Sequence, residues 1–408
     1  MNFRPTKISL QLVLTALVLA CMGASVPNNV LRVVPKPVDA KLVTEESNYL
    51  QGPSVLKLDG YFVWGATVVQ GDDDKYHMVF SLWESGPDRD VFNNGWVLES
   101  KLGYAVSDYP DRDFKFQKIF LKGARYDGNP EAWDAQGVHN PHLKKFGDKY
   151  YLYYIGGRDL GEKMAPDLDK RTRVQQNQQI GVLEFSSFQD LLDGKFDRPS
   201  KPLLSPRTRV KANQVLLPSP PGTEVKPDNL IVVNPSVDYN PNTGEYMLFF
   251  KGNIYEPNWK GVHGVATGPT PTGPFVAKDQ FIFDVRMPDG SIASAEDPYV
   301  WYSKAYGRFF AVVKDFTGRI SGGNPKDLAI LESEDGIDWK LGENPQFLKP
   351  EVILADGSQQ KLNRFERPQL LLDKKGLPRY LYAAASVDNV NGKKDGSSFN
   401  VHIPLKID

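Results

Sequence analysis

The chain has 408 residues, of which 40% are hydrophobic and 24% are charged, the balance of a globular protein with a large core. Lys and Arg total 49 against 50 for Asp and Glu, so the net charge of -1 predicts neither a nucleic-acid nor an anionic-membrane partner. Thirty-five Gly, 31 Pro and 12% aromatic residues favour many short strands joined by tight turns. The composition therefore predicts an all-β fold.

Residues 1–24 predict an export leader. Arg4 and Lys7 precede the apolar run "ISLQLVLTALVLA", which is too short for a convincing membrane span. The single cysteine, Cys21, follows in "LVLACMG", which resembles a bacterial lipoprotein box, although Leu19 is not the small residue usual two places earlier. The alternative is simple cleavage near Gly23 or Ala24. We expect an exported protein without disulfides, either a periplasmic or cell-surface lipoprotein whose membrane contact is a lipid on Cys21, or a secreted protein.

A two-strand unit recurs along the chain, and each copy consists of a polar pair, a Pro, an apolar strand, a turn and an aromatic-rich strand. The copies are "HNPHLKKFGDKYYLYYIGG" from His139, "VNPSVDYNPNTGEYMLFFKG" from Val233, "EDPYVWYSKAYGRFFAVVKD" from Glu296 and "ERPQLLLDKKGLPRYLYAA" from Glu366. A diverged copy, "VWGATVVQGDDDKYHMVFS" from Val63, aligns Gly65 with the prolines. Third strands are expected near Gly103, Gly181, Gly264 and Ala329.

Five such units predict a five-bladed β-propeller with four-stranded antiparallel blades over residues 51–408, preceded by an N-terminal extension over residues 25–50. A β-sandwich is the alternative, but it gives no reason for the same polar pair and Pro in every hairpin. In a propeller, the starts of the innermost strands converge at one mouth, and Pro is acceptable at a strand's first residues. The ends of the antiparallel second strands return to that mouth.

The residues predicted at the mouth combine carboxylates, amides, cations and tryptophan, which is the mixture that carbohydrate sites need. The catalytic candidates are Asp297, Glu366, Glu296, Asp134 in "EAWDAQGVHNP", and His139. The candidates for substrate binding are Trp64, Trp83, Asn140, His142, Asn234, Lys251, Lys314 and Arg367.

Several candidates also have a structural alternative. Glu366 and Arg367 would equally form an ion pair that closes the ring, Glu296 would accept backbone N–H groups, and Trp64 would be core. His139 and His142 suggest a metal pair, but no third ligand stands nearby. We expect no metal and no other cofactor.

The chain resembles the five-bladed glycosidase superfamily that includes glycoside hydrolase families 43, 32 and 117. The segments that carry the resemblance are "YHMVFS", "WDAQGVHNPHLKKFGDKYYLYYIGG", "AEDPYVWY", "LAILESEDGIDW" and "RFERPQLLLD". They are most similar to uncharacterised secreted family-43-like glycosidases of polysaccharide-degrading bacteria. The resemblance implies a base Asp in the first blade, a second Asp that tunes pKa and an acidic Glu, but here Trp64 and Asn234 stand where acids are usual.

The resemblance implies an exo-acting glycoside hydrolase that releases a terminal sugar from plant or algal polysaccharide fragments with inversion. We expect Asp297 as base and Glu366 as acid, with Glu296 or Asp134 tuning their pKa values. His139 is the alternative acid, because agar-oligosaccharide members of the superfamily are proposed to use a histidine.

Two other functions fit the same residues. A surface propeller that binds carbohydrate without catalysis would explain Trp64 and Asn234. A glycoside phosphorylase would hold phosphate with Lys251, Lys314 and Arg367. The same three cations suggest an anionic oligosaccharide, unless each cation only neutralises a neighbouring acid.

Overall fold

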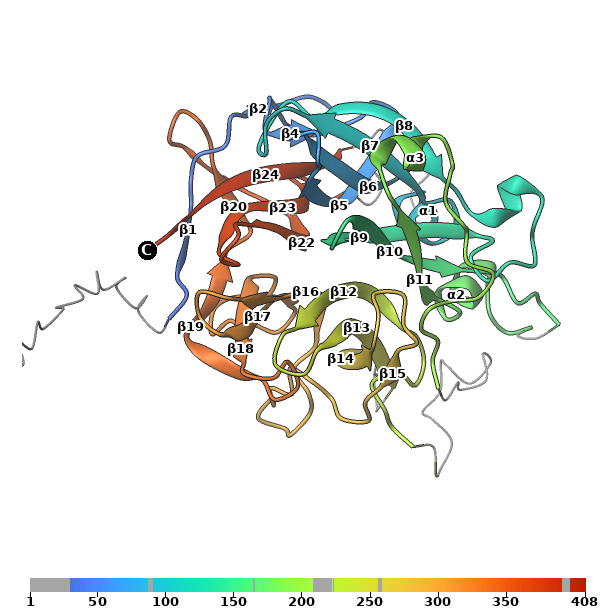
Figure 1. The fold of residues 1–408 in the computed structure, drawn as a ribbon. Coiled ribbons are helices and arrows are strands. Elements are labelled where there is room, and N and C mark those ends of the chain that lie inside the picture. Colours follow the sequence, from blue (N-terminus) through green and yellow to red (C-terminus); the bar gives the residue numbers. More distant parts are fainter. Residues whose placement is uncertain are drawn as a thin grey trace, which may run out of the picture.

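The computed structural model describes residues 30–86, 91–163, 166–207, 222, 224–255, 259–390 and 397–408. Within these ranges the chain forms five antiparallel sheets around a central axis (Figure 1). The predicted five-bladed β-propeller is confirmed. The predicted leader, Cys21 included, lies outside the described residues, and no helix in the described part is long and apolar enough to cross a membrane.

The blades follow one another in chain order. The first consists of β5 (Tyr61–Gln70), β6 (Tyr76–Glu84), β7 (Lys101–Ser107) and β8 (Lys115–Leu121), and the second of β9 (Gly137–Phe146), β10 (Lys149–Gly157) and β11 (Gln179–Phe185). The third consists of β12 (Val233–Asn240), β13 (Glu245–Tyr255), β14 (Trp259–Gly268) and β15 (Val276–Ala277). The fourth consists of β16 (Ala295–Ser303), β17 (Arg308–Asp315), β18 (Leu328–Ser333) and β19 (Lys340–Leu348).

The fifth blade joins the two ends of the described chain. It consists of β22 (Arg364–Leu372), β23 (Pro378–Ser386), β24 (Ser398–Ile407) and β1 (Val33–Pro35), and β4 (Val55–Leu56) also pairs with β24. Figure 1 shows β1, in blue, beside β24, in red. Val33–Pro35, within the predicted extension over residues 25–50, therefore supplies the outermost strand of the last blade, because β24 has an open edge that β1 can pair with.

The second blade has three strands in the described part of the chain, where four were predicted. Leu204 forms an isolated bridge with Ile180 of β11, so a single residue stands where the other blades place a fourth strand. The remaining strands form two small hairpins, β2 (Lys41–Val43) with β3 (Tyr49–Gln51) and β20 (Glu351–Ile353) with β21 (Gln359–Lys361).

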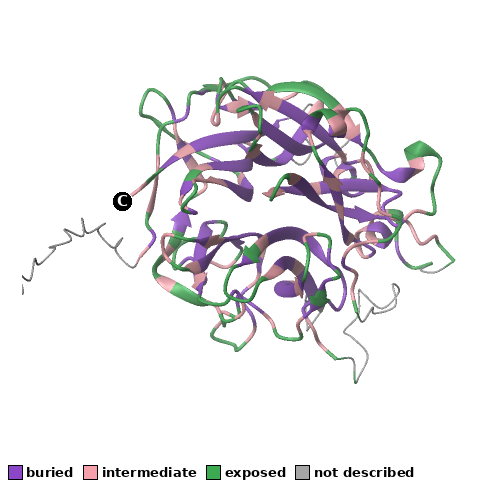
Figure 2. Ribbon diagram, viewed as in Figure 1, coloured by how far each residue is buried: buried purple, intermediate pink, exposed green. Residues whose placement is uncertain are grey.

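The core lies between neighbouring blades, since side chains of a strand alternate between its two faces. On β13, Phe249 packs in the cluster shared with the fourth blade, whereas Phe250 packs in the cluster shared with the second. Burial of a large apolar side chain contributes about 1.5–3 kcal/mol. Figure 2 shows the inner strands almost wholly buried and the outermost strands β8 and β19 largely exposed. The blades therefore hold one another through both faces.

The described loops between strands contain four short helical segments: α1 (Val91–Leu98), η1 (Ala124–Asp127), α2 (Lys170–Gln175) and α3 (Phe188–Leu192). The segments α1 and α2 follow the ends of second strands, β6 and β10, and contact each other. They therefore stand at the end of the channel where the inner strands begin.

Every inner strand carries a β-bulge at the predicted polar pair. The second residue of each pair has a left-handed backbone, with φ of 51° at Asn140, 54° at Asn234, 60° at Asp297 and 54° at Arg367. In the first blade this conformation belongs to Gly65, with φ of 47°. Gly65 therefore corresponds to these second residues and not to the prolines, which corrects the predicted alignment by one position. Trp64 is then the equivalent of His139, Val233, Glu296 and Glu366.

Candidate active site

A pocket of about 190 Å³ opens at the end of the channel where the inner strands begin. Residues from all five blades and from α1 and α2 line it. They are Trp64, Trp83, Phe92, Asn93, Trp96, His139, Asn140, Ile155, Gln175, Gln178, Ile231, Val233, Asn234, Lys251, Asn253, Glu296, Asp297, Arg364, Glu366 and Arg367. The predicted convergence of the polar pairs is thus present in the structure. The volume is below the ~300–1,000 Å³ of pockets for drug-sized ligands, so it suits one small ring.

The bulges explain why both members of a pair reach the pocket. In a regular strand, Glu296 and Asp297 would point to opposite faces. The left-handed turn at Asp297 brings both side chains to the channel, as bulges commonly re-aim a side chain near a functional site. A left-handed backbone costs a non-glycine residue about 1–2 kcal/mol, so four such residues at one mouth are backbone strain concentrated at this pocket.

Four left-handed residues line the inner end of the pocket, and together with the equivalent Gly65 of the first blade we call them the floor ring: Gly65, Asn140, Asn234, Asp297 and Arg367. Asn140 Nδ2 donates to Asn234 Oδ1 at 2.8 Å, and Asn234 Nδ2 donates to Asp297 Oδ1 at 2.7 Å. The Arg367 backbone N–H donates to Asp297 Oδ2 at 3.1 Å, and Arg367 Nη2 donates to the Asn140 carbonyl at 3.3 Å. Glycine suits position 65 because its φ of 47° is left-handed, while the side chain of Arg367 packs at ordinary contact distance beside it.

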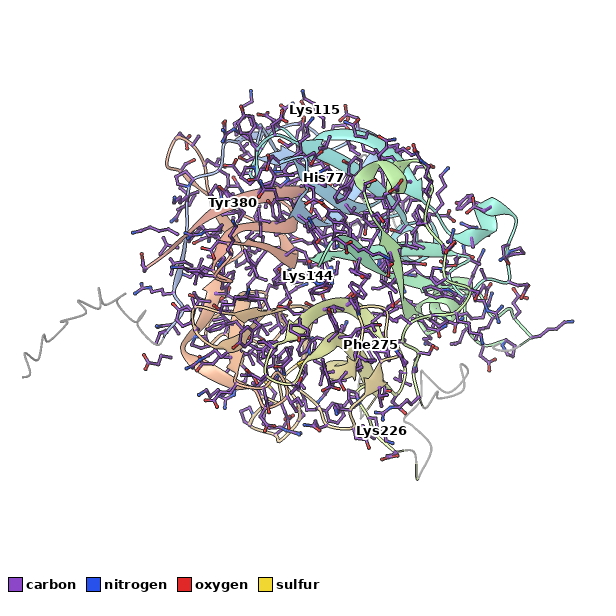
Figure 3. The ribbon with its side chains drawn as sticks, in the orientation of Figure 1. His77, Lys115, Lys144, Lys226, Phe275 and Tyr380 are labelled. Atoms are coloured by element: carbon purple, nitrogen blue, oxygen red, sulfur yellow. The ribbon has the colours of Figure 1, made fainter. Side chains whose placement is uncertain are left out.

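A second buried layer closes the channel beneath the floor ring. The His142 ring shares a 2.9 Å hydrogen bond between Nδ1 and Gln369 Oε1, and the Val237 N–H donates to Nε2 at 3.0 Å. Since Nε2 accepts, Nδ1 carries the proton, and burial lowers the pKa of His142 to about 3. Figure 3 shows Lys144, two residues further along β9, beside the central axis. The pocket is therefore blind.

Three carboxyl groups stand on the side of the pocket formed by the fourth and fifth blades. Glu296, Asp297 and Glu366 each place an oxygen within 4.8 Å of the other two. Lys314 Nζ hydrogen-bonds Glu296 Oε1 at 3.2 Å and Glu366 Oε1 at 2.5 Å. Lys251 Nζ donates to Glu296 Oε2 at 3.0 Å. A metal ion would suit three carboxylates at this spacing, but here the lysine ammonium groups supply the balancing charge.

The environment pushes the pKa values of two neighbouring carboxyl groups in opposite directions. Burial, followed by the charge of Glu296, raises the pKa of Asp297 to about 6. Burial also acts to raise the pKa of Glu296, but the charges of Lys251 and Lys314 outweigh it and hold that pKa at about 2. Near neutral pH Glu296 is ionised, whereas Asp297 exchanges its proton in the range where a general acid is useful.

The two groups also differ in accessibility. The Glu296 side chain is 19% exposed, whereas that of Asp297 is 5% exposed and lies 3.6 Å from Arg367 Nη1. Asp297 was predicted as the base and Glu366 as the acid. The raised pKa of Asp297 fits a proton donor better than a base, and Glu366 is held by Lys314 and by Arg364 Nη1 at 3.2 Å.

His139 lines the pocket but is held neutral. Gln178 Nε2 lies 3.1 Å from His139 Nε2, and burial, together with the charge of Arg367, lowers the pKa of His139 to about 3. An imidazole with this pKa is neutral near pH 7, and its remaining N–H is too weak an acid to protonate a leaving group. The acid role that the resemblance offered for His139 is therefore not supported by its surroundings.

Three predicted site residues do not line the pocket. Asp134 is buried elsewhere, where its Oδ2 accepts from Tyr154 Oη at 2.9 Å and from Arg198 Nε at 3.0 Å. His142 belongs to the layer beneath the floor ring, and Lys314 lies behind Glu296 and Glu366. The sequence predicted Asp134 at the pocket because it lies in the loop before β9. The sequence gives no sign of its ion pair with Arg198, which is 64 residues away.

Trp64 and Trp83 both line the pocket and pack in one aromatic cluster with Phe62 and Phe92, so Trp64 is core on one side and pocket wall on the other. Asn140, Asn234, Lys251 and Arg367 also lie at the pocket as predicted.

The sequence-based interpretation missed several lining residues. Arg364 precedes Glu366 by two positions in "RFERP", and residues two apart on a strand share a face, so this spacing was a usable signal. Trp96 on α1 and Gln178 come from loops after second strands, where the repeat carries no signal. Trp96 lies 5.4 Å from the His139 ring and is the half-buried aromatic face of the pocket.

No protein-family model and no curated protein matches the sequence. Solved structures do match it, among them a family 117 glycoside hydrolase produced by the marine bacterium Zobellia galactanivorans, with a TM-score of 0.53 and 13% identity over 93% of this chain and 90% of that one.

An alpha-L-arabinofuranosidase from Lactobacillus brevis matches with a TM-score of 0.51 and 11% identity over 85% and 91% of the two chains. A protein of unknown function from Dyadobacter fermentans matches with a TM-score of 0.52 and 13% identity over 87% and 100%. At these identities the likeness establishes the fold, and the chain has the five-bladed β-propeller that these glycoside hydrolases share.

Proposed function

We propose that the protein is a glycoside hydrolase. The observation that carries this proposal is the pair Glu296 and Asp297, two neighbouring carboxyl groups in a blind pocket whose pKa values are driven apart to about 2 and about 6. Two titratable groups with separated pKa values in one site are the usual mark of an acid paired with a nucleophile or base. The fold shared with solved glycoside hydrolases supports the same reaction class.

In the proposed reaction Asp297 is the proton donor and Glu296 the carboxylate that faces the anomeric carbon. Glu296 forms a bond to that carbon while the glycosidic C–O bond breaks, and the proton of Asp297 passes to the leaving oxygen. Water then gives a proton to Asp297 and displaces Glu296, which restores both groups. Lys251 and Lys314 keep Glu296 ionised.

The carboxyl spacing supports retention of configuration in place of the inversion expected from the resemblance. The nearest oxygens of Glu296, Asp297 and Glu366 lie within 4.8 Å of one another. Inverting pairs stand about 6.5–9.5 Å apart to admit a water molecule, whereas retaining pairs stand about 5–5.5 Å apart. Measured between their nearest oxygens, all three pairs fall short of the wider gap.

Attack on a chain end is supported by the shape of the pocket. The floor ring and the layer of His142 and Gln369 close the channel, so an oligosaccharide cannot pass through it. With room for about one ring, the pocket suits a terminal sugar against Trp96. Plant or algal polysaccharide fragments remain the proposed source of that sugar, and export as a lipoprotein or secreted protein remains part of the proposal.

The decisive experiment is incubation with a panel of plant and marine oligosaccharides in phosphate-free buffer, followed by chromatography of the products. Release of a monosaccharide by the wild type, lost in Glu296→Gln, supports the hydrolase. Proton NMR of the first product gives its anomeric configuration. Product formed only after phosphate is added would identify a phosphorylase, and binding without product would identify a carbohydrate-binding propeller.

A further inference from the structure

Arg364 is the most open cation of the pocket. It is the first residue of β22, its side chain is 25% exposed, and it lines the pocket beside Glu366. Arg367, by contrast, is 1% exposed and belongs to the floor ring, and Lys314 lies behind the carboxylates. The sequence suggested Lys251, Lys314 and Arg367 as the cations that would bind an anionic substrate. Of these three, Lys251 lies at the pocket surface, and Arg364 is a further cation there.

The guanidinium of Arg364 has donors to spare. A guanidinium carries five N–H groups, and among the described residues Arg364 has one hydrogen bond, from Nη1 to Glu366 Oε1 at 3.2 Å. Its Cζ lies 4.9 Å from the Phe92 ring centroid and 5.9 Å from that of Trp64. These aromatic faces hold the planar guanidinium in place before a ligand binds, so binding costs less side-chain conformational entropy.

The charges around the pocket do not cancel. Lys251, Glu296, Lys314, Glu366 and Arg364 form a chain of ion pairs, and Asp297 pairs with Arg367. Four cations thus face three carboxylates, which leaves one positive charge in excess even when every carboxyl group is ionised. Protonation of Asp297 increases the excess by one. In a pocket with buried walls, such an excess attracts an anion.

We propose that Arg364 binds an anionic group, a carboxylate or a sulfate ester, carried by the terminal sugar. A guanidinium fork with free donors matches the paired oxygens of either group. The inference rests on the proposed function, since it names the substrate class of the same pocket. The competing role for Arg364 is neutralisation of Glu366, but Lys314 already donates to that same oxygen at 2.5 Å.

The test is calorimetric binding of matched sugars to the wild-type protein: galactose, galacturonate and galactose 6-sulfate, then glucose and glucuronate. Arg364→Gln removes the charge, and Arg364→Lys keeps the charge but removes the fork. Arg308→Gln is the matched control, since Arg308 is 21% exposed and pairs with Glu332 at 3.1 Å on the fourth blade, outside the pocket.

We expect at least one acidic sugar to bind at least tenfold more tightly than its neutral partner. This preference should shrink between about 0.01 M and about 0.1 M salt, as the Debye length falls from about 30 Å to about 10 Å. Arg364→Gln should abolish the preference, Arg364→Lys should keep part of it, and Arg308→Gln should leave it unchanged. Tighter binding of galacturonate than of galactose 6-sulfate would identify the anionic group as a carboxylate, and the opposite order would identify it as a sulfate ester.

Equal or tighter binding of the neutral sugars, or an acidic preference that survives Arg364→Gln, overturns the inference, as does failure of every acidic sugar to bind. The outcome is separable from that of the proposed function. Hydrolysis of neutral oligosaccharides without any effect of Arg364→Gln would leave the hydrolase standing and remove the anionic substrate. If acidic sugars bind through Arg364 but no oligosaccharide is cleaved, the anionic ligand would stand and the hydrolase would be removed. Thermal unfolding of both Arg364 variants checks that they are folded.

Discussion

The side-chain amide of Asn234 donates a 2.7 Å hydrogen bond to Asp297 Oδ1, across the boundary between the third and fourth blades. Both residues have left-handed backbones, with φ of 54° and 60°. The amide stabilises the carboxylate form of Asp297, yet burial and the neighbouring carboxylates outweigh it and raise the pKa. Asn234 occupies the position where the resemblance implied a pKa-tuning acid, so here an amide, and not a second carboxylate, faces Asp297 from the third blade.

The first prediction concerns the nucleophile. Glu296→Gln keeps the size of the side chain but removes the charge, so hydrolysis should fall by about a hundredfold or more. Glu332→Gln is the control, because Glu332 pairs with Arg308 and Lys340 on the fourth blade and lies outside the pocket. Initial rates of sugar release measure the effect. Equal rates for the two variants would remove Glu296 from the mechanism.

The second prediction concerns pH. If Asp297 donates the proton, activity should decline as pH rises through about 6, because the acid form is then lost. Asn234→Asp places a second carboxyl group 2.7 Å from Asp297 Oδ1, and two such groups resist joint ionisation, so the alkaline limb should move to higher pH. The pH dependence of kcat/KM is the measurement. A limb that stays in place in Asn234→Asp argues against Asp297 as the acid.

The third prediction concerns the backbone at Gly65. Because φ is 47°, Gly65→Ala should lower the free energy of unfolding by about 1–2 kcal/mol. Gly60→Ala, at φ of 78° and with no atoms near the added Cβ, should lower the free energy of unfolding by a similar amount. Gly342→Ala, where the added Cβ also meets no atoms but φ is not positive, should leave the free energy of unfolding unchanged. Urea denaturation compares the three variants. An unchanged free energy of unfolding in Gly65→Ala would show that the left-handed backbone at this position imposes no strain on alanine.

The fourth prediction concerns closure of the ring. Pairing of β1 with β24 spans Val33 with Ile407, Val34 with Lys406 and Pro35 with Leu405, and Leu31 is buried in the adjoining core. A chain that starts at Val38 should therefore unfold at a lower temperature than one that starts at Val30, since it exposes the edge of β24. Calorimetry of the two chains is the comparison. Identical melting temperatures would show that β1 adds nothing to the ring.

The fifth prediction concerns export. A lipid on Cys21 would hold the protein to a membrane without a spanning helix, so Cys21→Ala should move it to the soluble fraction of the producing cells. Fractionation followed by immunoblotting measures the shift. Unchanged membrane association of Cys21→Ala would argue against lipidation, and absence of the wild type from membranes would favour the cleaved, secreted form.

The sequence by itself determined the five hairpin units and the end of the channel at which their polar pairs meet. A hairpin forms between residues that are close in the sequence, so the local residue pattern predicts its turn and its strands. The motifs "HNP" and "EDP", each followed by apolar and aromatic strands, are examples. Once five equal units are recognised, radial repetition leaves little freedom in where the inner strands begin. His139, Asn140, Glu296 and Asp297 therefore lie at the pocket as predicted.

The tertiary structure decided what depends on distant parts of the chain. The pairing of β1 with β24 joins strands more than 350 residues apart, and the ion pair of Asp134 with Arg198 forms between blade loops that follow no repeat. The assignment of Gly65 to the left-handed position depends on backbone dihedrals that glycine permits but does not require. The charge of Glu296 acts on its sequence neighbour Asp297, but the two pKa values diverge because both groups are buried and because Lys251 and Lys314, distant in the sequence, hold Glu296 ionised.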